Sequence, residues 1–264
     1  MKKVIFLINI IFSLSFNAQG LELRAYEDDQ VVQLIRSHSL DGVVWLDAGK
    51  KTFLALYQEP PIANSLQAAI ILHSMGMHAD WPGVVTSMRK QIPKAGWATL
   101  SVQLPLLDPQ IGYAEYGNTF KEANNRVRAS IRYLQDRGYT DIVVIGYSFG
   151  ATSAINYLVT YDSVIKALVG ISMQPHLFLK PKYDLIQKIS DIKIPILDVF
   201  GSKDFSGVIR SSDDRRLAAI KGGTSAYNQV IISSANHYFT GRENDLMYAI
   251  INWLNTIVAE NSNQ

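Results

Sequence analysis

The sequence of 264 residues contains no cysteine. This absence excludes disulfide bonds, thiolate metal sites, a cysteine nucleophile and lipid attachment through an N-terminal cysteine. Charged residues are also scarce, at 18% of the chain, and Lys and Arg form no cluster. Because 48% of the residues are hydrophobic, the chain is expected to fold around a sizeable core. The lack of a basic cluster argues against a nucleic acid as partner.

Residues 1–20 have the pattern of a secretory signal peptide. Two lysines precede an uncharged apolar run, Val4 to Phe16, and a small-residue exit follows at Ala18-Gln19-Gly20. The run is too short to span a bilayer comfortably as a helix. We therefore expect an exported protein, periplasmic or secreted, whose mature chain is 21–264, with no stable membrane span after cleavage. The alternatives are a buried N-terminal strand or helix, or an uncleaved anchor.

The mature chain is expected to form one domain, because it has no internal repeat and no linker-like stretch. Apolar runs at Val43 to Leu46 and Thr52 to Tyr57 flank Asp47-Ala48-Gly49-Lys50 and predict an antiparallel hairpin. Further strands are predicted at Ala68 to Leu72, Ala98 to Leu104, Ile142 to Ile145, Ala167 to Ile171, Ile196 to Phe200 and Gln229 to Ile232. These later runs are rich in Ile, Val and Leu, as expected for strands that helices cover on both faces.

Helical patterns separate the predicted strands. In Phe120 to Arg137 the apolar positions fall three or four residues apart, and Gly138 is expected to end the helix. A similar stripe runs from Leu246 to Ile257 near the C-terminus. The alternation of strands and helices predicts a mostly parallel sheet with helices on both faces and the first hairpin as an antiparallel edge. Functional sites in such sheets lie at the carboxyl ends of the strands.

A candidate nucleophile lies at one of these strand ends. The strand Ile142 to Ile145 leads into Gly146-Tyr147-Ser148-Phe149-Gly150 and then into a helical segment. This is the G-x-S-x-G pattern in the strand-turn-helix context that gives the pattern its meaning. The two glycines allow strand and helix to approach closely, and the N-terminal dipole of the helix favours developing negative charge. We therefore expect Ser148 to be a nucleophile.

A serine nucleophile needs a histidine as its base and an acid that orients the histidine, in the order Ser, acid, His for this arrangement. His237 is the one histidine beyond the last predicted strand. Asp204 follows the preceding strand at Gly201-Ser202-Lys203-Asp204, whereas the alternative acid, Asp198, lies within that strand. Asp213 and Asp214 are expected to begin the next helix. The sequence thus predicts a Ser148, Asp204 and His237 triad.

An oxyanion hole is expected at the loop His73-Ser74-Met75-Gly76, where lipases and esterases carry a His-Gly segment. The backbone N–H groups of Met75 and Phe149 are the predicted donors. His73 is expected to fix the loop rather than to react. A metal site at His73, His78 and Asp80 is the alternative, although this spacing is not diagnostic.

Taken together, these motifs resemble the α/β-hydrolase superfamily over nearly all of the mature chain. The resemblance rests on the serine turn, the strand exit at Asp204, Asn236-His237 and the His73 loop. It implies an α/β-hydrolase fold. Within the superfamily, the sequence is most similar to an exported, poorly characterised bacterial branch and is serine esterase-like. One departure is Ser74, where many relatives have glycine, and its Cβ is expected to constrain the oxyanion loop.

The resemblance implies hydrolysis of carboxylic esters through an acyl-enzyme, without a cofactor and without a metal. The substrate would be a small-molecule or cell-envelope ester. Only Met173 to Ile194 separate the sixth and seventh predicted strands, so no large lid insertion is expected and the site should be open. The alternatives are an acyltransferase or thioesterase with the same triad, and a non-catalytic binding protein that keeps the fold.

Overall fold

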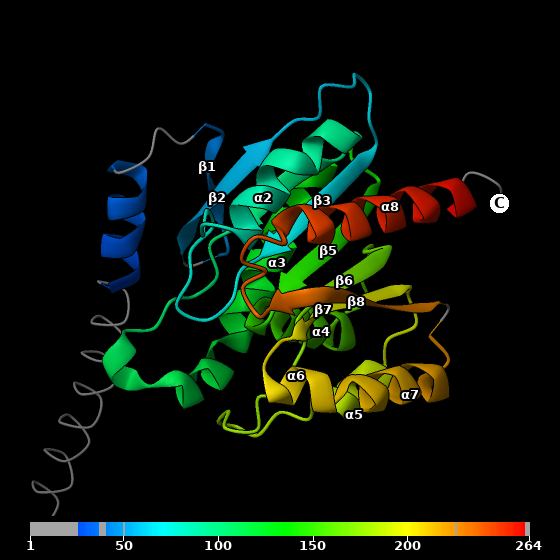
Figure 1. Ribbon diagram of the computed structural model, residues 1–264. Helices are drawn as coiled ribbons and strands as arrows, with labels where there is room; N and C mark the ends of the chain where they lie inside the picture. The colour runs from blue at the N-terminus through cyan, green and yellow to red at the C-terminus, as the bar shows by residue number, and fades with distance from the viewer. Residues whose placement is uncertain (1–25, 37–40, 50, 225, 262–264) are drawn as a thin grey trace, which may run out of the picture.

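The computed structural model describes residues 26–36, 41–49, 51–224 and 226–261 (Figure 1). The predicted signal peptide lies outside these described residues. The sequence predicts one domain for residues 21–264. In the described residues, all the strands belong to one sheet.

The described residues form an eight-stranded sheet in the order β1-β2-β4-β3-β5-β6-β7-β8 (Figure 1). Its strands are β1 (Val43–Asp47), β2 (Thr52–Gln58), β3 (Gln67–Leu72), β4 (Ala98–Val102), β5 (Asp141–Tyr147), β6 (Ala167–Ile171), β7 (Ile196–Lys203) and β8 (Tyr227–Asn236). The strands β1 and β2 pair antiparallel, as do β2 and β4, and every other pair is parallel. This confirms the predicted mostly parallel sheet with an antiparallel hairpin at its edge.

Helices cover both faces of the sheet, as predicted. Besides a helix at residues 26–36, the α-helices are α2 (Val84–Gln91), α3 (Phe120–Gln135), α4 (Phe149–Thr160), α5 (Leu185–Ser190), α6 (Ser206–Arg210), α7 (Ser212–Gly222) and α8 (Glu243–Asn261). The short 3₁₀ helices are η1 (Pro93–Ala95), η2 (Pro109–Ile111) and η3 (Tyr113–Thr119). Apolar residues of α2 and α8 pack on one face, and those of α3, α4, α5 and α7 pack on the other (Figure 1). Among the described helices, none combines the length and apolar character needed to cross a membrane.

The central strand β5 shows why the sheet is buried on both sides. Ile142 and Val144 belong to the core on one face, whereas Val143 and Ile145 belong to the core on the other. Each of these side chains is at most 1% exposed. Burying a side chain of this size contributes roughly 1.5–3 kcal/mol to folding. The unbroken apolar runs of the sequence thus match strands that both layers of helices cover.

Several predicted boundaries differ from the structure: β4 ends at Val102 rather than Leu104, and β5 and β7 are longer than predicted. The strand β8 continues to Asn236, beyond the predicted end at Ile232, because its polar positions lie at the edge of the sheet next to β7 alone. The helix α3 ends at Gln135, and Gly138 takes a φ of +87° just beyond it, which is the conformation that glycine favours after a helix.

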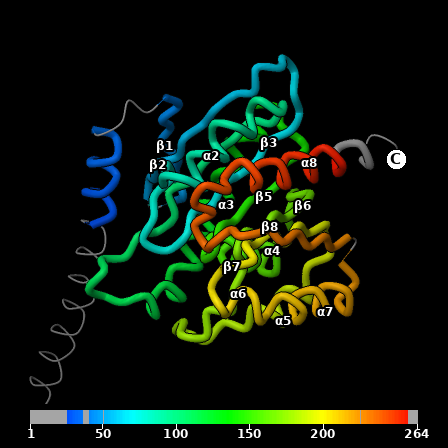
Figure 2. The backbone as a smooth tube through the Cα atoms, in the orientation of Figure 1, coloured from blue at the N-terminus to red at the C-terminus, as the bar shows by residue number. Residues whose placement is uncertain are grey.

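Residues 26–36 form a helix that the sequence analysis did not predict. Figure 2 shows this helix beside β1 and β2. Its Val31 and Leu34 are buried against Leu54 and Leu56 of β2 and against Ala79. The helix therefore closes the part of the sheet near its antiparallel edge.

Candidate active site

The strand β5 passes directly into α4 at Ser148, as the motif predicts. Ser148 has a φ of +53°, an uncommon conformation for a residue with a side chain, and it is 3% exposed. A Cβ added at Gly146 would lie 2.4 Å from Ala151 Cα, and one at Gly150 would lie 2.2 Å from Leu72 O. Both glycines are therefore required by the close approach of β5, α4 and the end of β3.

Asp204 and His237 are brought together at the ends of β7 and β8. The Nδ1 atom of His237 lies 2.6 Å from Asp204 Oδ1, and both residues are buried. Because the carboxylate accepts at Nδ1, the other ring nitrogen, Nε2, is left to act as a base. The hydroxyl of Tyr147 donates to the carbonyl oxygen of His237 at 3.0 Å. His237 is thus fastened to the residue that precedes Ser148.

Asp204 is held as an anion by several donors besides the histidine. Ser172 Oγ donates to Oδ2 at 2.5 Å, and the backbone N–H of Phe205 donates to Oδ1 at 2.7 Å. Burial alone would raise the pKa of this carboxyl, but the hydrogen bonds from His237 and Ser172 outweigh burial and hold the pKa below its usual value. The charge of Asp204 is therefore available to orient the imidazole.

Ser172 was missed by the sequence analysis. It follows β6 directly, has a φ of +52° and is completely buried. Its backbone N–H donates to Val199 O at 2.8 Å, which fixes the residue against β7. The only signal in the sequence was a serine at a strand end, which is a common position for serine.

The structure does not join Ser148 and His237 by a hydrogen bond. Within the described part of the chain, Ser148 Oγ has no hydrogen-bond partner, and the contact with His237 runs through Tyr147, whose ring centroid lies 5.5 Å from that of the imidazole. Catalytic hydrogen bonds are often long before a substrate is bound. Among the described residues, the Ser148 hydroxyl therefore forms no hydrogen bond that a substrate would have to displace.

The predicted oxyanion loop forms a tight turn. The N–H of Met77 donates to Ser74 O at 3.2 Å, and Gly76 takes a φ of +68°, which such a turn needs at its third position. The N–H of Gly76 donates to Tyr116 Oη at 3.1 Å. The N–H of Met75 has no partner among the described residues. It is therefore free to bind a ligand.

The second predicted donor, the N–H of Phe149, lies at the start of α4. Its one partner in the described structure is Ser74 Oγ, at the long distance of 3.5 Å. The first N–H groups of a helix have no partner within the helix and carry part of its positive dipole. The two backbone donors that the sequence singled out thus have weak partners or none.

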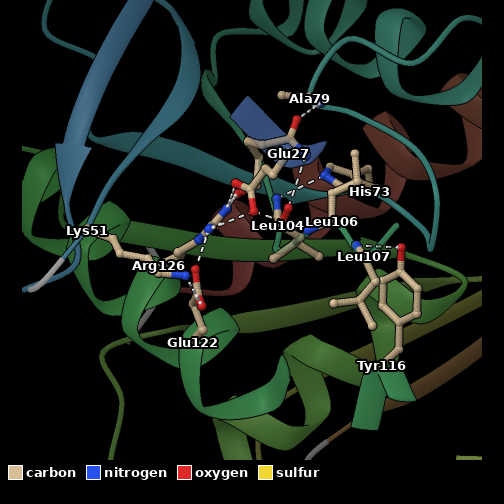
Figure 3. Close-up of polar contacts among 11 residues, drawn as sticks. Glu27, Lys51, His73, Ala79, Leu104, Leu106, Leu107, Tyr116, Glu122 and Arg126 are labelled. Carbon is tan, nitrogen blue, oxygen red and sulfur yellow. Dashed lines mark hydrogen bonds and ion pairs between the residues drawn. The ribbon is translucent and has the colours of Figure 1, made fainter. Parts of the chain in front are cut away.

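His73 is fixed through both of its ring nitrogens. Nε2 accepts from the N–H of Leu104 at 2.9 Å (Figure 3). Nδ1 donates to Ser74 O at 2.8 Å. Burial lowers the pKa of His73 to about 3, so the ring is neutral near neutral pH. These contacts are those of a histidine that holds the loop.

The sequence analysis left two alternatives, a metal site that includes Asp80 and Asp198 as the orienting acid. Both aspartates form ion pairs in the structure. Asp80 forms an ion pair with Arg89, and no group of three or more His, Asp or Glu within the described ranges could hold a metal ion. Asp198 is fully buried in an ion pair with Arg215, at 2.9 Å from Nε. Asp213 and Asp214 lie in the first turn of α7, as predicted.

A buried arginine fastens the segment next to the oxyanion loop (Figure 3). Arg126, on α3, donates to Glu27 Oε1 at 2.6 Å, to Glu122 at 2.5 Å and to Gln103 O at 2.7 Å. Glu27 also accepts from the N–H of Leu106 at 3.3 Å. The helix at 26–36 is therefore linked to the segment that carries the partner of His73.

Aromatic side chains surround the Asp204 and His237 pair. Phe205 stacks on the imidazole of His237 with the ring centroids 4.0 Å apart, and its side chain is 45% exposed. Tyr238 is 52% exposed and contacts both rings edge-on. His176 packs against Phe149, and burial, together with the nearby His237, lowers its pKa to about 4. The surroundings of the site are therefore apolar and partly open.

Comparison with solved structures identifies the fold. Est1E from Butyrivibrio proteoclasticus superposes with a TM-score of 0.68 at 17% identity over 83% of this chain and 100% of that chain, and Est1E has also been solved with ferulic acid bound. The Pyrococcus furiosus esterase Pf2001 gives 0.66 at 17% identity over 81% and 91%. XC6422 from Xanthomonas campestris, an α/β serine hydrolase without a lid, gives 0.61 at 18% identity over 78% and 90%. The predicted α/β-hydrolase fold is confirmed.

The absence of a large lid is also confirmed for this chain. Between β6 and β7, which the structure describes without a gap, the chain forms a loop and α5, a helix of 6 residues. Comparison with curated proteins found no match. A family model, however, matches residues 22–119 and 115–256, which is most of the sequence. The chain is therefore a member of the family described as Protein of unknown function (DUF3530).

Proposed function

We propose that this protein is a serine hydrolase that acts on carboxylic esters, with Ser148 as nucleophile, His237 as base and Asp204 as the orienting acid. One observation carries the proposal. The strained turn at Ser148 directly follows Tyr147, whose hydroxyl donates to the carbonyl oxygen of His237 at 3.0 Å, and His237 in turn contacts the buried Asp204 at 2.6 Å. The structural likeness to esterases supports the proposal through the fold alone.

In the first step, Ser148 Oγ attacks the carbonyl carbon of the ester while Nε2 of His237 takes the hydroxyl proton. Negative charge develops on the former carbonyl oxygen, which the N–H groups of Met75 and Phe149 bind. The bond to the alcohol then breaks, and the alkoxide takes the proton back from Nε2. An acyl-Ser148 and a free alcohol result.

Water completes the cycle by the same chemistry in reverse. His237 takes a proton from water, the resulting hydroxide attacks the acyl carbon, and Ser148 leaves with the proton from Nε2. Asp204 remains ionised throughout and stabilises the imidazolium that forms twice in each cycle. No metal or organic cofactor takes part in these steps.

The substrate is proposed to be a small-molecule or cell-envelope ester that reaches an open site. The short segment between β6 and β7 leaves no second layer to close over the site. Exposed Phe205 and Tyr238 beside His237 favour an apolar group next to the scissile bond. We also propose that the protein is exported through residues 1–20, which an N-terminal sequence of the mature protein would test.

A fluorophosphonate probe tests the nucleophile. We expect the purified protein to be labelled at Ser148 and Ser148→Ala to remain unlabelled. A binding protein that only keeps the fold would not react, and this result would overturn the proposal. Hydrolysis across p-nitrophenyl esters of increasing acyl length, methyl ferulate and acetylated cell-envelope polymers then defines the substrate. Transfer of the acyl group to an added alcohol in preference to water would indicate an acyltransferase.

A further inference from the structure

The side chain of Ser74 contacts one of the two proposed backbone donors of the oxyanion hole, and Ser74 directly precedes the other in the sequence. Its Oγ accepts from the N–H of Phe149 at 3.5 Å, and its own backbone precedes the free N–H of Met75. Within the described structure, the proton of this hydroxyl has no acceptor. A hydroxyl that accepts weakly and donates to nothing has its donor available for a ligand.

We propose that the Ser74 hydroxyl is a third hydrogen-bond donor to the oxyanion, alongside the N–H groups of Met75 and Phe149. The inference rests on the proposed function. It adds a catalytic residue that the oxyanion hole does not need when glycine stands at this position, because glycine has no side chain to donate.

The distance between two of the three donors suits a shared oxygen. Phe149 N and Ser74 Oγ lie 3.5 Å apart, so one oxygen can lie at about 2.9 Å from both of them. When the oxyanion arrives, the N–H of Phe149 exchanges a long bond to a neutral hydroxyl for a bond to a charged oxygen. The Ser74 proton then turns toward the same oxygen, and bonds to a charged group are about twice as strong as neutral ones.

The surroundings hold Ser74 in this place. Its carbonyl oxygen accepts from His73 Nδ1 at 2.8 Å and from the N–H of Met77 at 3.2 Å. The residue is 8% exposed, so bulk water competes weakly for the hydroxyl. A donor that is fixed before the reaction loses little free energy to reorganisation when charge develops.

The test compares Ser74→Ala and Ser74→Gly with the unaltered protein on a soluble p-nitrophenyl ester. We expect kcat to fall on the order of 10²-fold in both variants with little change in KM, because the donor acts on the transition state. Ser74→Thr keeps the hydroxyl and should recover most of the loss. Ser153→Ala, which removes a buried serine hydroxyl on α4 that lacks a partner in the described structure, should remain active and serves as control.

A trifluoromethyl ketone provides a readout that a purely structural role would not move. It adds to Ser148 and forms a hemiketal oxyanion. Its inhibition constant should therefore increase in Ser74→Ala by about the factor by which kcat/KM falls. The corresponding trifluoromethyl alcohol cannot form the adduct and should bind equally to both proteins. The pKa of the enzyme-bound hemiketal, followed by ¹⁹F NMR, should rise in the variant.

The outcomes separate the inference from the proposed function. If the unaltered protein is labelled by the fluorophosphonate and hydrolyses esters, but Ser74→Ala and Ser74→Gly keep kcat and the affinity for the ketone, the inference is wrong and the function stands. Faster turnover of these variants would show that Ser74 obstructs the hole and would also overturn the inference. A protein that neither labels nor hydrolyses overturns both. Should Ser74→Ala fail to fold, Ser74→Gly and Ser74→Thr give the same comparison.

Discussion

Asp204 and Asp198 are two buried carboxylates on or next to the same strand, β7, yet their surroundings differ in kind. Asp198 lies within the strand and is bound by Arg215, whose Nε is 2.9 Å away, and by the hydroxyl of Tyr227 at 2.6 Å. Asp204 follows the end of the strand, and its partners are Ser172 and His237. One carboxylate faces a permanent cation, and the other faces an imidazole that can gain and lose a proton.

The difference shows how one element serves stability and chemistry at separate positions. The charge of Arg215 already balances Asp198, and the pair has no exposed atoms to offer a ligand. The charge of Asp204 is only partly balanced by neutral donors, so it can stabilise a proton that arrives at His237. The proposed site thus lies at the carboxyl ends of the strands, where sites in such sheets are usually found.

The largest expected effect is on the nucleophile and its base. Ser148→Ala and His237→Ala should each lower kcat on the order of 10⁴- to 10⁶-fold, and the double variant should be scarcely worse, because the triad works as a unit. Steady-state kinetics on a p-nitrophenyl ester measure this. Losses that multiply in the double variant would show two independent roles and would contradict the assignment.

Exchanging each aspartate for asparagine tests the comparison directly. Asp204→Asn should lower kcat about 10⁴-fold with the fold retained, because the amide favours the wrong tautomer of His237. Asp198→Asn leaves Arg215 buried without its counter-charge, so it should lower the free energy of unfolding by about 3–5 kcal/mol while the folded fraction stays active. Urea unfolding and kinetics on both proteins measure the contrast. The reverse pattern would place the orienting acid within the strand.

A smaller effect is expected at the other buried ion pair. Glu27→Gln should lower the free energy of unfolding by about 1–3 kcal/mol, because Arg126 loses one charged partner but keeps Glu122. Asp29→Asn, an exposed change on the same helix, is the matched control and should stay within about 0.5 kcal/mol of the unaltered protein. Equal stability of the two variants would mean that the helix at 26–36 is not fastened through Glu27.

The stability of the protein is also expected to depend on pH. His73 and His176 have pKa values lowered by burial to about 3 and about 4, against about 6.5 in an unfolded chain. Between these values the unfolded chain binds more protons, so the free energy of unfolding should fall as the pH drops from 6.5 to 4, by up to about 1.4 kcal/mol per pH unit for each histidine. Urea midpoints at several pH values measure this. His73→Gln should give a shallower slope, and an unchanged slope would show that His73 does not contribute.

Local patterns predicted the sheet and much of the site. The strand-turn-helix context of Ser148 depends on residues that are neighbours in the sequence, and β5 and α4 form there. The predicted pairing of Asp204 with His237 followed from their order after two strands, and the structure places them 2.6 Å apart. These features are visible in a sequence because each is encoded within a few residues of a strand end.

Contacts between distant segments were not visible in the same way. The sequence analysis did not single out Arg126 of α3, yet the structure buries it to 2% exposure and pairs it with Glu27, far away in the sequence. Ser172 and Phe205 acquire their roles only when β6, β7 and β8 are side by side. No spacing rule connects such residues, so the supporting contacts of the site needed the structure.

The order of the strands has a consequence for how the protein is made. The turn at Ser74 follows β3, whereas His237 comes after β8, the last strand of the described sheet. Parallel pairs such as β7 and β8 close only after the long connection between them has been synthesised, and such non-local pairing slows folding. During synthesis, the proposed site can therefore form only with the last strand, and α8, which covers one face of the core, follows later still. A product that ends before β8 would carry Ser148 without its base.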